Sequence, residues 1–205
     1  RSSLGRLTAR FGWPQIRGNA KVGSTGMRVI GLAGWSGAGK TTLLTRIIPR
    51  LVGRGLTVST VKHAHHGFDV DHPGKDSYAH RVAGAREVLV SSPVRFALMH
   101  ELRGAPEPEL AQLLGKLSPV DLVLVEGFKR EPHPKLEVYR AVVGKPCLYL
   151  DDPDIIAIAS DQPMPDVPIR AVLLDDMQTI VDILLDNAIP VEEAVARGRS
   201  GTWRS

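Results

Sequence analysis

Short apolar runs alternate along this chain with longer segments whose apolar residues recur every three or four positions. Val29–Ala33 is the first such run, and Lys40–Val52 is the first periodic segment, with its leucines and isoleucines on one face of a helix. Pro49 lies inside that helix and is expected to kink it or to end its regular part. Asp121–Val125 is apolar after its first residue, which is typical of a strand buried on both faces.

The same alternation continues to about residue 190. Further strands are predicted at Leu56–Val61, Glu87–Ser91, Val94–Met99, Leu136–Tyr139, Ile155–Ala159 and Ala171–Leu174. Further helices are predicted at Asp76–Ala83, Pro106–Leu117 and Met177–Leu185. Because strands and helices alternate, the sequence predicts an α/β fold, with a mainly parallel sheet that carries helices on both faces.

The two ends of the chain do not continue this pattern. Residues 1–26 and 196–205 contain Lys and Arg but no Asp or Glu, and neither stretch shows hydrophobic periodicity. We therefore expect residues 1–26 to be a disordered extension and residues 27–190 to be the folded domain. Residues 191–205 are expected to form a flexible basic tail.

The net charge of +4 comes from these ends. They hold eight of the 26 Lys and Arg residues, which leaves 18 basic against 22 acidic residues in the rest of the chain. A body without excess positive charge does not favour nucleic-acid binding. No apolar run approaches the roughly 20 residues of a membrane span. The single cysteine, Cys147, fits a reducing compartment, so we expect a cytoplasmic protein without a membrane anchor.

The segment between the first strand and the first helix reads Gly34-Trp-Ser-Gly-Ala-Gly-Lys-Thr41, a complete G-x-x-x-x-G-K-T phosphate loop. Its glycines let successive backbone N–H groups face a polyphosphate, and the next helix adds the positive end of its dipole. Lys40 is placed to reach the β- and γ-phosphates, and the Thr41 hydroxyl to hold Mg²⁺. The expected nucleotide-binding residues are Gly34, Trp35, Ser36, Gly37, Ala38, Gly39, Lys40, Thr41 and Thr42. The fold is therefore expected to be of the P-loop NTPase type.

A carboxylate follows the buried strand Asp121–Val125, in the pair Glu126-Gly127. In a parallel sheet, ligands bind beyond the carboxyl ends of the strands. We therefore expect Glu126 to hold Mg²⁺ directly or through water, together with Thr41. Gly127 is expected to let a backbone N–H approach the terminal phosphate.

The second predicted strand runs into a polar loop, His63–Ser77, which holds four of the seven histidines and three acids. In one interpretation its His and carboxylate side chains form a Zn²⁺ or Ni²⁺ site. In the other, which the irregular spacing favours, Asp69 or Asp71 supports Mg²⁺ while Lys62 and Lys75 meet anionic groups of a ligand. Of the two acids, Asp71 is taken as the candidate metal ligand.

Taken together, these motifs resemble the MobB family. The motifs that carry the resemblance are the phosphate loop, Lys62-His63 running into Asp69–Tyr78, Ala83-Gly84-Ala85, Val125–Lys129 and Ala157–Asp161. The resemblance covers roughly residues 28–185, so both ends of the chain lie outside it.

The resemblance implies a GTP-binding adapter protein of molybdopterin guanine dinucleotide biosynthesis, which uses Mg²⁺ and forms a homodimer. Its implied partner is a MobA-type guanylyltransferase, which joins a GMP unit to molybdopterin. Molybdopterin itself is a further ligand that the resemblance allows. The family is only weakly hydrolytic, so the resemblance implies at most a weak GTPase. The sequence shows no convincing general base, so no catalytic residue is assigned.

Guanine recognition is the part of this interpretation that the motifs support least. The chain has no N-K-x-D stretch. Asp161, at the end of the strand Ile155–Ala159, is either an acceptor for the N1 and N2 donors of guanine or a turn residue ahead of Pro163. Two other functions stay open: a P-loop small-molecule kinase, and a metal-delivery GTPase that uses the His63–His72 loop.

Overall fold

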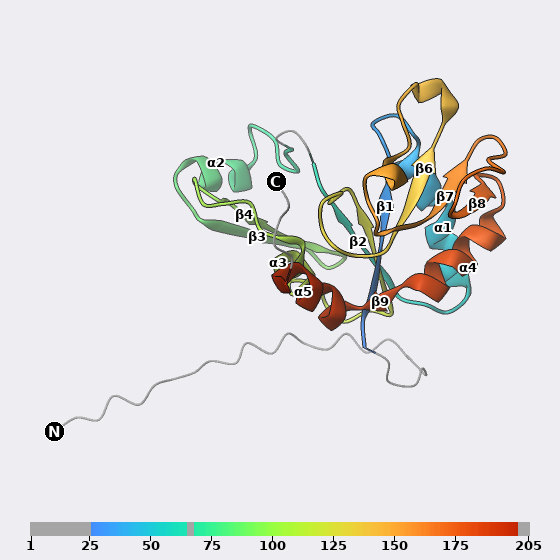
Figure 1. Ribbon diagram of the computed structural model, residues 1–205. Coiled ribbons are helices and arrows are strands. Elements are labelled where there is room, and N and C mark those ends of the chain that lie inside the picture. Colours follow the sequence, from blue (N-terminus) through green and yellow to red (C-terminus); the bar gives the residue numbers. More distant parts are fainter. Residues whose placement is uncertain (1–25, 65–67, 201–205) are drawn as a thin grey trace.

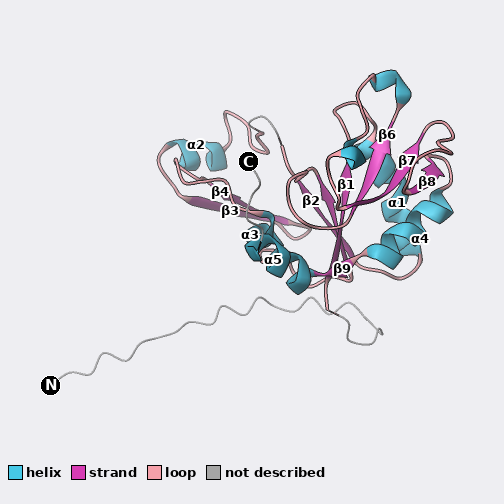
Figure 2. Cartoon of the chain, viewed as in Figure 1, coloured by secondary structure: helices cyan, strands magenta, loops and turns pink. Residues whose placement is uncertain are grey.

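The structure is a computed structural model, and it describes residues 26–64 and 68–200 (Figures 1 and 2). The strands are β1 (Arg28–Ala33), β2 (Val58–Lys62), β3 (Glu87–Ser91), β4 (Phe96–His100), β5 (Leu122–Glu126), β6 (Lys135–Tyr139), β7 (Ile155–Ser160), β8 (Arg170–Leu173) and β9 (Ile189–Pro190). The α-helices are α1 (Lys40–Gly53), α2 (Asp76–Val82), α3 (Leu110–Leu114), α4 (Met177–Asn187) and α5 (Val191–Ser200), with short 3₁₀ turns η1 (Ala141–Val143) and η2 (Leu148–Leu150). The predicted extension 1–26 lies, except for Gly26, outside the described residues.

Within the described residues, seven strands form the main sheet in the order β2-β5-β1-β6-β7-β8, with β9 paired to β1. All neighbours along this order are parallel, and only β9 runs antiparallel to its partner. β5 is buried along its whole length, as its apolar sequence predicts. The predicted mainly parallel α/β fold is confirmed. The carboxyl ends of β1, β2, β5, β6 and β7 all lie at one edge of the sheet, where ligands bind in such folds.

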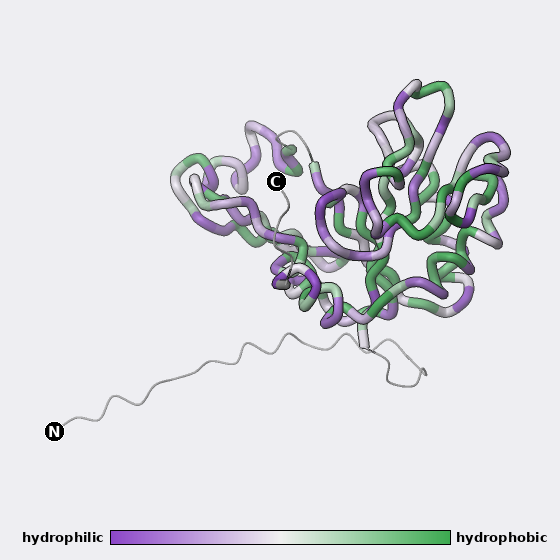
Figure 3. The backbone as a smooth tube through the Cα atoms, viewed as in Figure 1, coloured by the Kyte–Doolittle hydropathy of each residue, from purple (hydrophilic) through white to green (hydrophobic). Residues whose placement is uncertain are grey.

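Helices cover both faces of the main sheet (Figure 1). On one face, α1 and α4 pack their apolar stripes on Ile30 and Leu32 of β1. On the other face, α3 and α5 pack on Val29 of β1 and on Val123 and Val125 of β5. Figure 3 shows the apolar stretches of the chain gathered along these strands. Burial of both faces holds β1 and β5, and with them the residues at their carboxyl ends, in fixed positions.

The antiparallel hairpin β3–β4 forms a separate two-stranded sheet beside α2 and projects to one side of the main sheet (Figure 1). Its side chains are poorly covered, with only Val88 buried among the ten strand residues. Leu89, Phe96 and Leu98 are exposed by 52%, 53% and 44%. A hairpin with this much apolar surface in water is a candidate surface for association.

Two sequence expectations differ from the structure. Residues 191–205 were expected to be a flexible tail, but α5 extends to Ser200 because Val191 and Ala194 are buried against the sheet. The helix expected over Pro106–Leu117 is only α3, since Glu109 and Gln112 form a capping box that starts the helix after both prolines. The helix predicted over Lys40–Val52 is confirmed, because α1 spans Lys40–Gly53 and continues past Pro49.

Candidate functional site

The phosphate loop joins β1 to α1 and has a backbone conformation that suits anion binding. Gly34, Gly37 and Gly39 have positive φ angles of 145°, 81° and 96°. A Cβ atom on Gly34 would lie 2.6 Å from the carbonyl oxygen of Val138, so a larger residue does not fit there. α1 begins at Lys40, directly after the loop, and its first backbone N–H groups have no partners within the helix. The loop therefore fits a polyphosphate.

Lys40 folds back over the loop. Its Nζ donates hydrogen bonds to two loop carbonyl oxygens, at 2.8 Å and 3.0 Å. Burial lowers the pKa of Lys40 below its usual value; Glu126 opposes this shift, whereas Lys129 and Lys62 add to it. Three ammonium groups thus act on one another around a single loop. Such a concentration of positive charge is favourable when an anionic ligand binds between them.

Thr41 and Glu126 meet at the position where Mg²⁺ is expected. Thr41 Oγ1 donates to Glu126, at 3.0 Å from Oε1 and 3.2 Å from Oε2. Lys62, at the end of β2, places its Nζ 3.5 Å from Glu126 Oε1 and 3.5 Å from Thr41 Oγ1. A hydroxyl and a carboxylate are hard oxygen ligands of the kind that Mg²⁺ prefers. Lys62 balances the charge of the largely buried Glu126 in this arrangement.

The two residues after Glu126 both have a left-handed backbone, with φ 94° at Gly127 and 49° at Phe128. Glycine is required at the first position, because a Cβ atom there would lie 2.7 Å from the Cβ atom of His63. Phe128 adopts this conformation with a bulky side chain, which costs roughly 1–2 kcal/mol. Its ring centroid lies 4.9 Å from that of His63. This strained turn sets two aromatic rings next to the candidate metal ligand.

On the other side of β1, residues at the ends of β6 and β7 approach the phosphate loop. Arg140 follows β6 and donates from Nε to the carbonyl oxygen of Ala38 at 3.2 Å. Asp161 follows β7, is exposed, and accepts a hydrogen bond from the backbone N–H of Ala141 at 3.3 Å. The residue that contacts Asp161, Ala141, directly follows Arg140, whose side chain contacts the phosphate loop. Asp161 stands on the opposite side of the loop from Glu126.

Two supporting residues were not identified from the sequence. Arg140 is one, and Glu137 of β6 is the other. The Glu137 carboxylate is fully buried and accepts hydrogen bonds from the backbone N–H groups of Leu148 at 2.7 Å and Tyr149 at 3.0 Å. Burial raises the pKa of Glu137 above its usual value. The signal available in the sequence was a lone acid within the apolar run Leu136–Tyr139.

The contacts that Asp71 makes in the structure are with its own segment and with α2. Asp71 Oδ1 accepts a hydrogen bond from Ser77 Oγ at 2.9 Å, and Arg81 Nε lies 3.4 Å from Asp71 Oδ2. Arg81 also forms an ion pair with Asp69 at 2.9 Å. The charge of Asp71 is therefore already balanced by Arg81, within the segment that leads into α2. The assignment of Asp71 as a Mg²⁺ ligand stays a prediction, which these contacts with Ser77 and Arg81 do not support.

The histidine-rich loop is only partly described. His65 and His66 lie outside the described residues, and His72 is exposed. His63 Nε2 lies 2.8 Å from Glu107 Oε1. Within residues 26–64 and 68–200, no three His, Cys, Asp or Glu side chains are grouped so as to hold a metal ion.

A hollow of about 470 Å³ adjoins the Glu126 end of the site. It is lined by residues that follow β2 and β5 and by residues that precede α3: His63, Glu107, Pro108, Glu109, Phe128, Lys129, Arg130 and Glu131. Lys129 reaches from this hollow to the phosphate loop, where its Nζ lies 4.4 Å from the centre of the Trp35 ring. The hollow therefore combines aromatic, acidic and basic side chains beside the loop.

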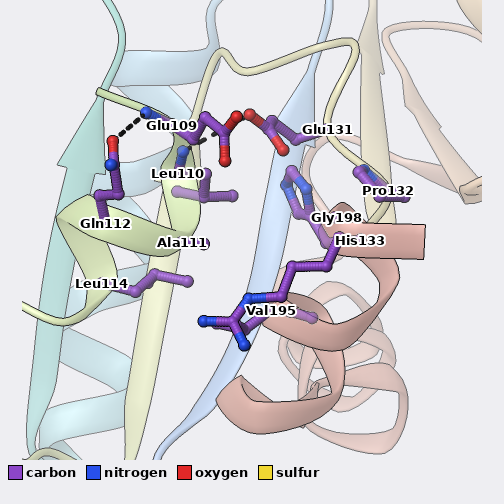
Figure 4. Close-up of a pocket in the computed structure, with 12 residues that line it drawn as sticks. Glu109, Leu110, Ala111, Gln112, Leu114, Glu131, Pro132, His133, Val195 and Gly198 are labelled. Carbon is purple, nitrogen blue, oxygen red and sulfur yellow. Dashed lines mark hydrogen bonds between the residues drawn. The ribbon is translucent and has the colours of Figure 1, made fainter. Parts of the chain in front are cut away.

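A second hollow, of about 290 Å³, lies between α3, α5 and residues 131–133 (Figure 4). Glu109 and Glu131 line both hollows, and Figure 4 shows their carboxyl groups together at one end of the second. His133 forms a buried wall, with 1% exposure, and neither ring nitrogen has a hydrogen-bond partner among the described residues. Burial, with a smaller contribution from Lys135, lowers the pKa of His133 to about 3. The ring packs on Gly31 of β1, where a Cβ atom would collide with it.

Among the described residues, no helix combines the length and the apolar composition that a membrane-spanning segment needs.

Comparison with known proteins identifies one family. The sequence model described as "MobB: Molybdopterin guanine dinucleotide synthesis protein B" matches residues 29–161. The match begins in β1 and ends at Asp161, so it includes the phosphate loop, Glu126 and the candidate base-binding acid.

Two similar relatives are named molybdopterin-guanine dinucleotide biosynthesis adapter protein. The relative from Escherichia coli is 40% identical over 168 residues, which are 80% of this chain and 95% of the relative. The relative from Haemophilus influenzae is 41% identical over 140 residues, which are 66% of this chain and 76% of the relative. Both alignments span most of the relative's own length.

Solved structures agree with these relatives. A structure described as molybdopterin-guanine biosynthesis protein B (mobB) superposes with a TM-score of 0.62 at 27% identity, covering 77% of this chain and 98% of that one. The structure of Bacillus subtilis MobB gives a TM-score of 0.59 at 25% identity, covering 78% and 97%.

Proposed function

Because the chain belongs to the MobB family, we propose that it is a GTP-binding adapter protein that assists a MobA-type guanylyltransferase. Its part in molybdopterin guanine dinucleotide biosynthesis follows from the family and from the names of its relatives. The proposal adds that the chain binds GTP and Mg²⁺, that it assists the transferase and that it acts in the cytoplasm.

The observation that carries the proposal is the pairing of Thr41 with Glu126 at the end of the phosphate loop. With Lys40 between the loop carbonyls and Glu126, the site has a cation for phosphate oxygens and two oxygen ligands for Mg²⁺. On binding, Mg²⁺ supplies the positive charge that Lys62 now provides near Glu126. Lys62 is then available to a terminal phosphate.

Asp161 is the proposed acceptor for guanine. Its carboxylate lies beyond β7, on the side of the loop away from Glu126, and its partner Ala141 adjoins Arg140. A carboxylate accepts two parallel N–H bonds, which matches the N1 and N2 donors of guanine. The nucleotide would therefore extend from Asp161, along the loop, to Glu126.

A homodimer is part of the proposal, and the β3–β4 hairpin is its proposed surface. Leu89, Phe96 and Leu98 are exposed there, and a second copy of the hairpin would cover them. An adapter that pairs in this way presents two nucleotide sites to its partner.

Titration with a fluorescent GTP analogue, with and without Mg²⁺, tests the nucleotide site. Lys40→Ala should weaken binding about 10- to 150-fold, since charge-assisted contacts are each worth roughly 1.5–3 kcal/mol. Lys116→Ala is the matched control, because Lys116 is exposed and lies after α3. Equal affinity in wild type and Lys40→Ala would remove the phosphate-loop assignment and the proposed function with it.

A further inference from the structure

We propose that the 290 Å³ hollow between α3, α5 and residues 131–133 binds a small organic cation, a guanidinium group on an uncharged aliphatic stem (Figure 4). The hollow lies on the face of the main sheet that α3 and α5 cover, and its lining includes neither the phosphate loop nor Glu126. Ligand sites commonly measure about 300–1,000 Å³, so this volume suits a small ligand. The inference adds a site that the proposed function does not use.

Two carboxylates line one end of the hollow. Glu109 directly precedes α3 and caps it, and Glu131 Oε1 accepts a hydrogen bond at 3.4 Å from the backbone N–H of Leu110, the first residue of that helix. Both carboxylates are therefore held at the same helix end (Figure 4). Within residues 26–64 and 68–200, neither forms an ion pair with a basic side chain. Two negative charges held near each other repel, and a bound cation relieves this repulsion.

His133 supplies a third acceptor at the wall of the hollow. Its ring is 1% exposed, and neither ring nitrogen has a hydrogen-bond partner among the described residues. Burial is the main reason that the pKa of His133 is lowered to about 3, so the ring is neutral at pH 7 and keeps one nitrogen lone pair. Buried polar atoms usually have a partner. A neutral ring does not repel a cation, and an N–H group of the ligand can provide that partner.

The arrangement of these acceptors favours a guanidinium. Glu109, Glu131 and His133 are not grouped so as to hold one metal ion. An ammonium carries all its donors on one atom, whereas a guanidinium spreads five N–H groups over three nitrogens in one plane. It can donate to two carboxylates on separate segments and keep an N–H for the histidine. A guanidinium is also more weakly hydrated than an ammonium, which favours it in a partly enclosed hollow.

The apolar part of the lining favours an aliphatic stem. Leu110 and Leu114 of α3 and Ala194 of α5 line the hollow, and they belong to the buried cluster that includes Val29 of β1. These walls are anchored to the sheet, and an aliphatic stem that packs on them leaves water. Arg199 also lines the hollow, and its positive charge disfavours a second cationic group on the ligand. The expected ligand therefore carries a single charge.

The probe is n-butylguanidinium, which has one guanidinium and an aliphatic stem. Isothermal titration calorimetry of the full-length protein at pH 7.5 measures its binding. Wild type should bind it saturably at millimolar concentration, and about threefold or more tightly than n-butylammonium. Glu131→Gln and Glu109→Gln should each weaken binding about fivefold or more, because each removes the charge behind a charge-assisted hydrogen bond. Neither carboxylate is in the buried core, and glutamine at position 109 keeps an oxygen that can cap α3.

Two further variants distinguish this site from a general attraction of cations to acidic surface. Asp186→Asn removes an exposed carboxylate of α4, on the opposite face of the sheet, and should leave binding unchanged. Arg199→Gln removes a like charge from the lining and should tighten binding about twofold. Equal weakening by Glu131→Gln and Asp186→Asn would overturn the inference, as would weaker binding to Arg199→Gln.

A blocked tripeptide, N-acetyl-Ala-Arg-Ala amide, tests the source of the guanidinium. It should bind more weakly than n-butylguanidinium, because its backbone has to remain outside the hollow. Binding as tight as that of n-butylguanidinium would overturn the small-molecule ligand and assign the hollow to an arginine side chain of another protein.

The absence of saturable n-butylguanidinium binding to wild type at millimolar concentration overturns the inference as a whole. This result leaves the proposed function intact, because the hollow is separate from the phosphate loop. Conversely, Lys40→Ala should bind n-butylguanidinium as wild type does, so a failure of GTP binding would not affect the inference.

Discussion

His133 makes the stability of this protein sensitive to mild acid. Its ring is buried between the main sheet and the hollow of Figure 4, with both ring nitrogens lacking a hydrogen-bond partner within the described residues. Replacing it with leucine keeps a side chain of similar size and removes the titrating group. Because no hydrogen bond of the ring to a described residue is lost, His133→Leu should cost little stability at pH 7.5. The variant also no longer buries two unpaired nitrogen atoms, which raises its stability.

The magnitude follows from the pKa of His133, which is about 3 in the folded chain and 6.5 as its ordinary value. Because the folded pKa is lowered, the unfolded state binds a proton as pH falls below 6.5 while the folded state remains neutral. Stability is therefore lost from pH 6.5 downward, at about 1.4 kcal/mol per pH unit once the unfolded histidine is fully protonated, and the loss ends near pH 3. Integrated to pH 5, the loss is about 2 kcal/mol.

Urea unfolding at pH 7.5 and pH 5.0 measures this effect, with the free energy of unfolding taken by linear extrapolation. Wild type loses stability in acid through its carboxylates as well, so the quantity to compare is the difference between wild type and His133→Leu. Between pH 7.5 and pH 5.0, the free energy of unfolding of wild type should fall by about 2 kcal/mol more than that of His133→Leu. His80→Leu, at an exposed position of α2, is the control for loss of a histidine. A difference that is the same at both pH values would show that the folded state accommodates a charged His133, and would refute the reasoning.

Three further predictions concern the nucleotide base, the dimer and the ends of the chain. Asp161→Asn should shift preference from GTP toward xanthosine triphosphate in competition titrations, because the amide can donate to the xanthine carbonyl; an unchanged preference would make Asp161 a turn residue only. Serine at both Phe96 and Leu98 should give a monomer by light scattering, and a persistent dimer would place the interface elsewhere. Truncation after Pro190 should lower the melting temperature, because it removes the buried Val191, whereas removal of residues 1–26 should leave it unchanged.

Much of the site could be predicted from the sequence because its parts are local. The phosphate loop is one continuous segment, and Glu126 directly follows a strand whose apolar run marks it as buried. Because the strands are parallel, the phosphate loop and Glu126 lie at the same edge of the sheet. Their proximity therefore follows from the fold class alone.

The remaining features depend on contacts between distant segments. The contact of Asp71 with Arg81, ten positions later on α2, is one of them. α5 has few apolar residues, and Val191 and Ala194 are buried only because they pack in one cluster with Val29. Arg140 becomes part of the site only because β6 lies next to β1. Patterns of hydrophobicity carry no information about such pairings until the strand order is fixed.

The adapter role is tested most directly by molybdopterin guanine dinucleotide formation, measured with a purified MobA-type transferase, molybdopterin, GTP and Mg²⁺. Wild-type protein should raise the rate of formation. Glu126→Gln should lose this stimulation together with Mg²⁺-dependent GTP affinity, while its Mg²⁺-free binding changes little, because the variant keeps the shape but not the charge that balances the metal. Glu192→Gln, exposed at the start of α5, is the matched control and should stimulate as wild type does. A wild-type protein that gives no stimulation, and instead transfers phosphate from ATP to a small metabolite, would contradict the adapter role and establish a kinase.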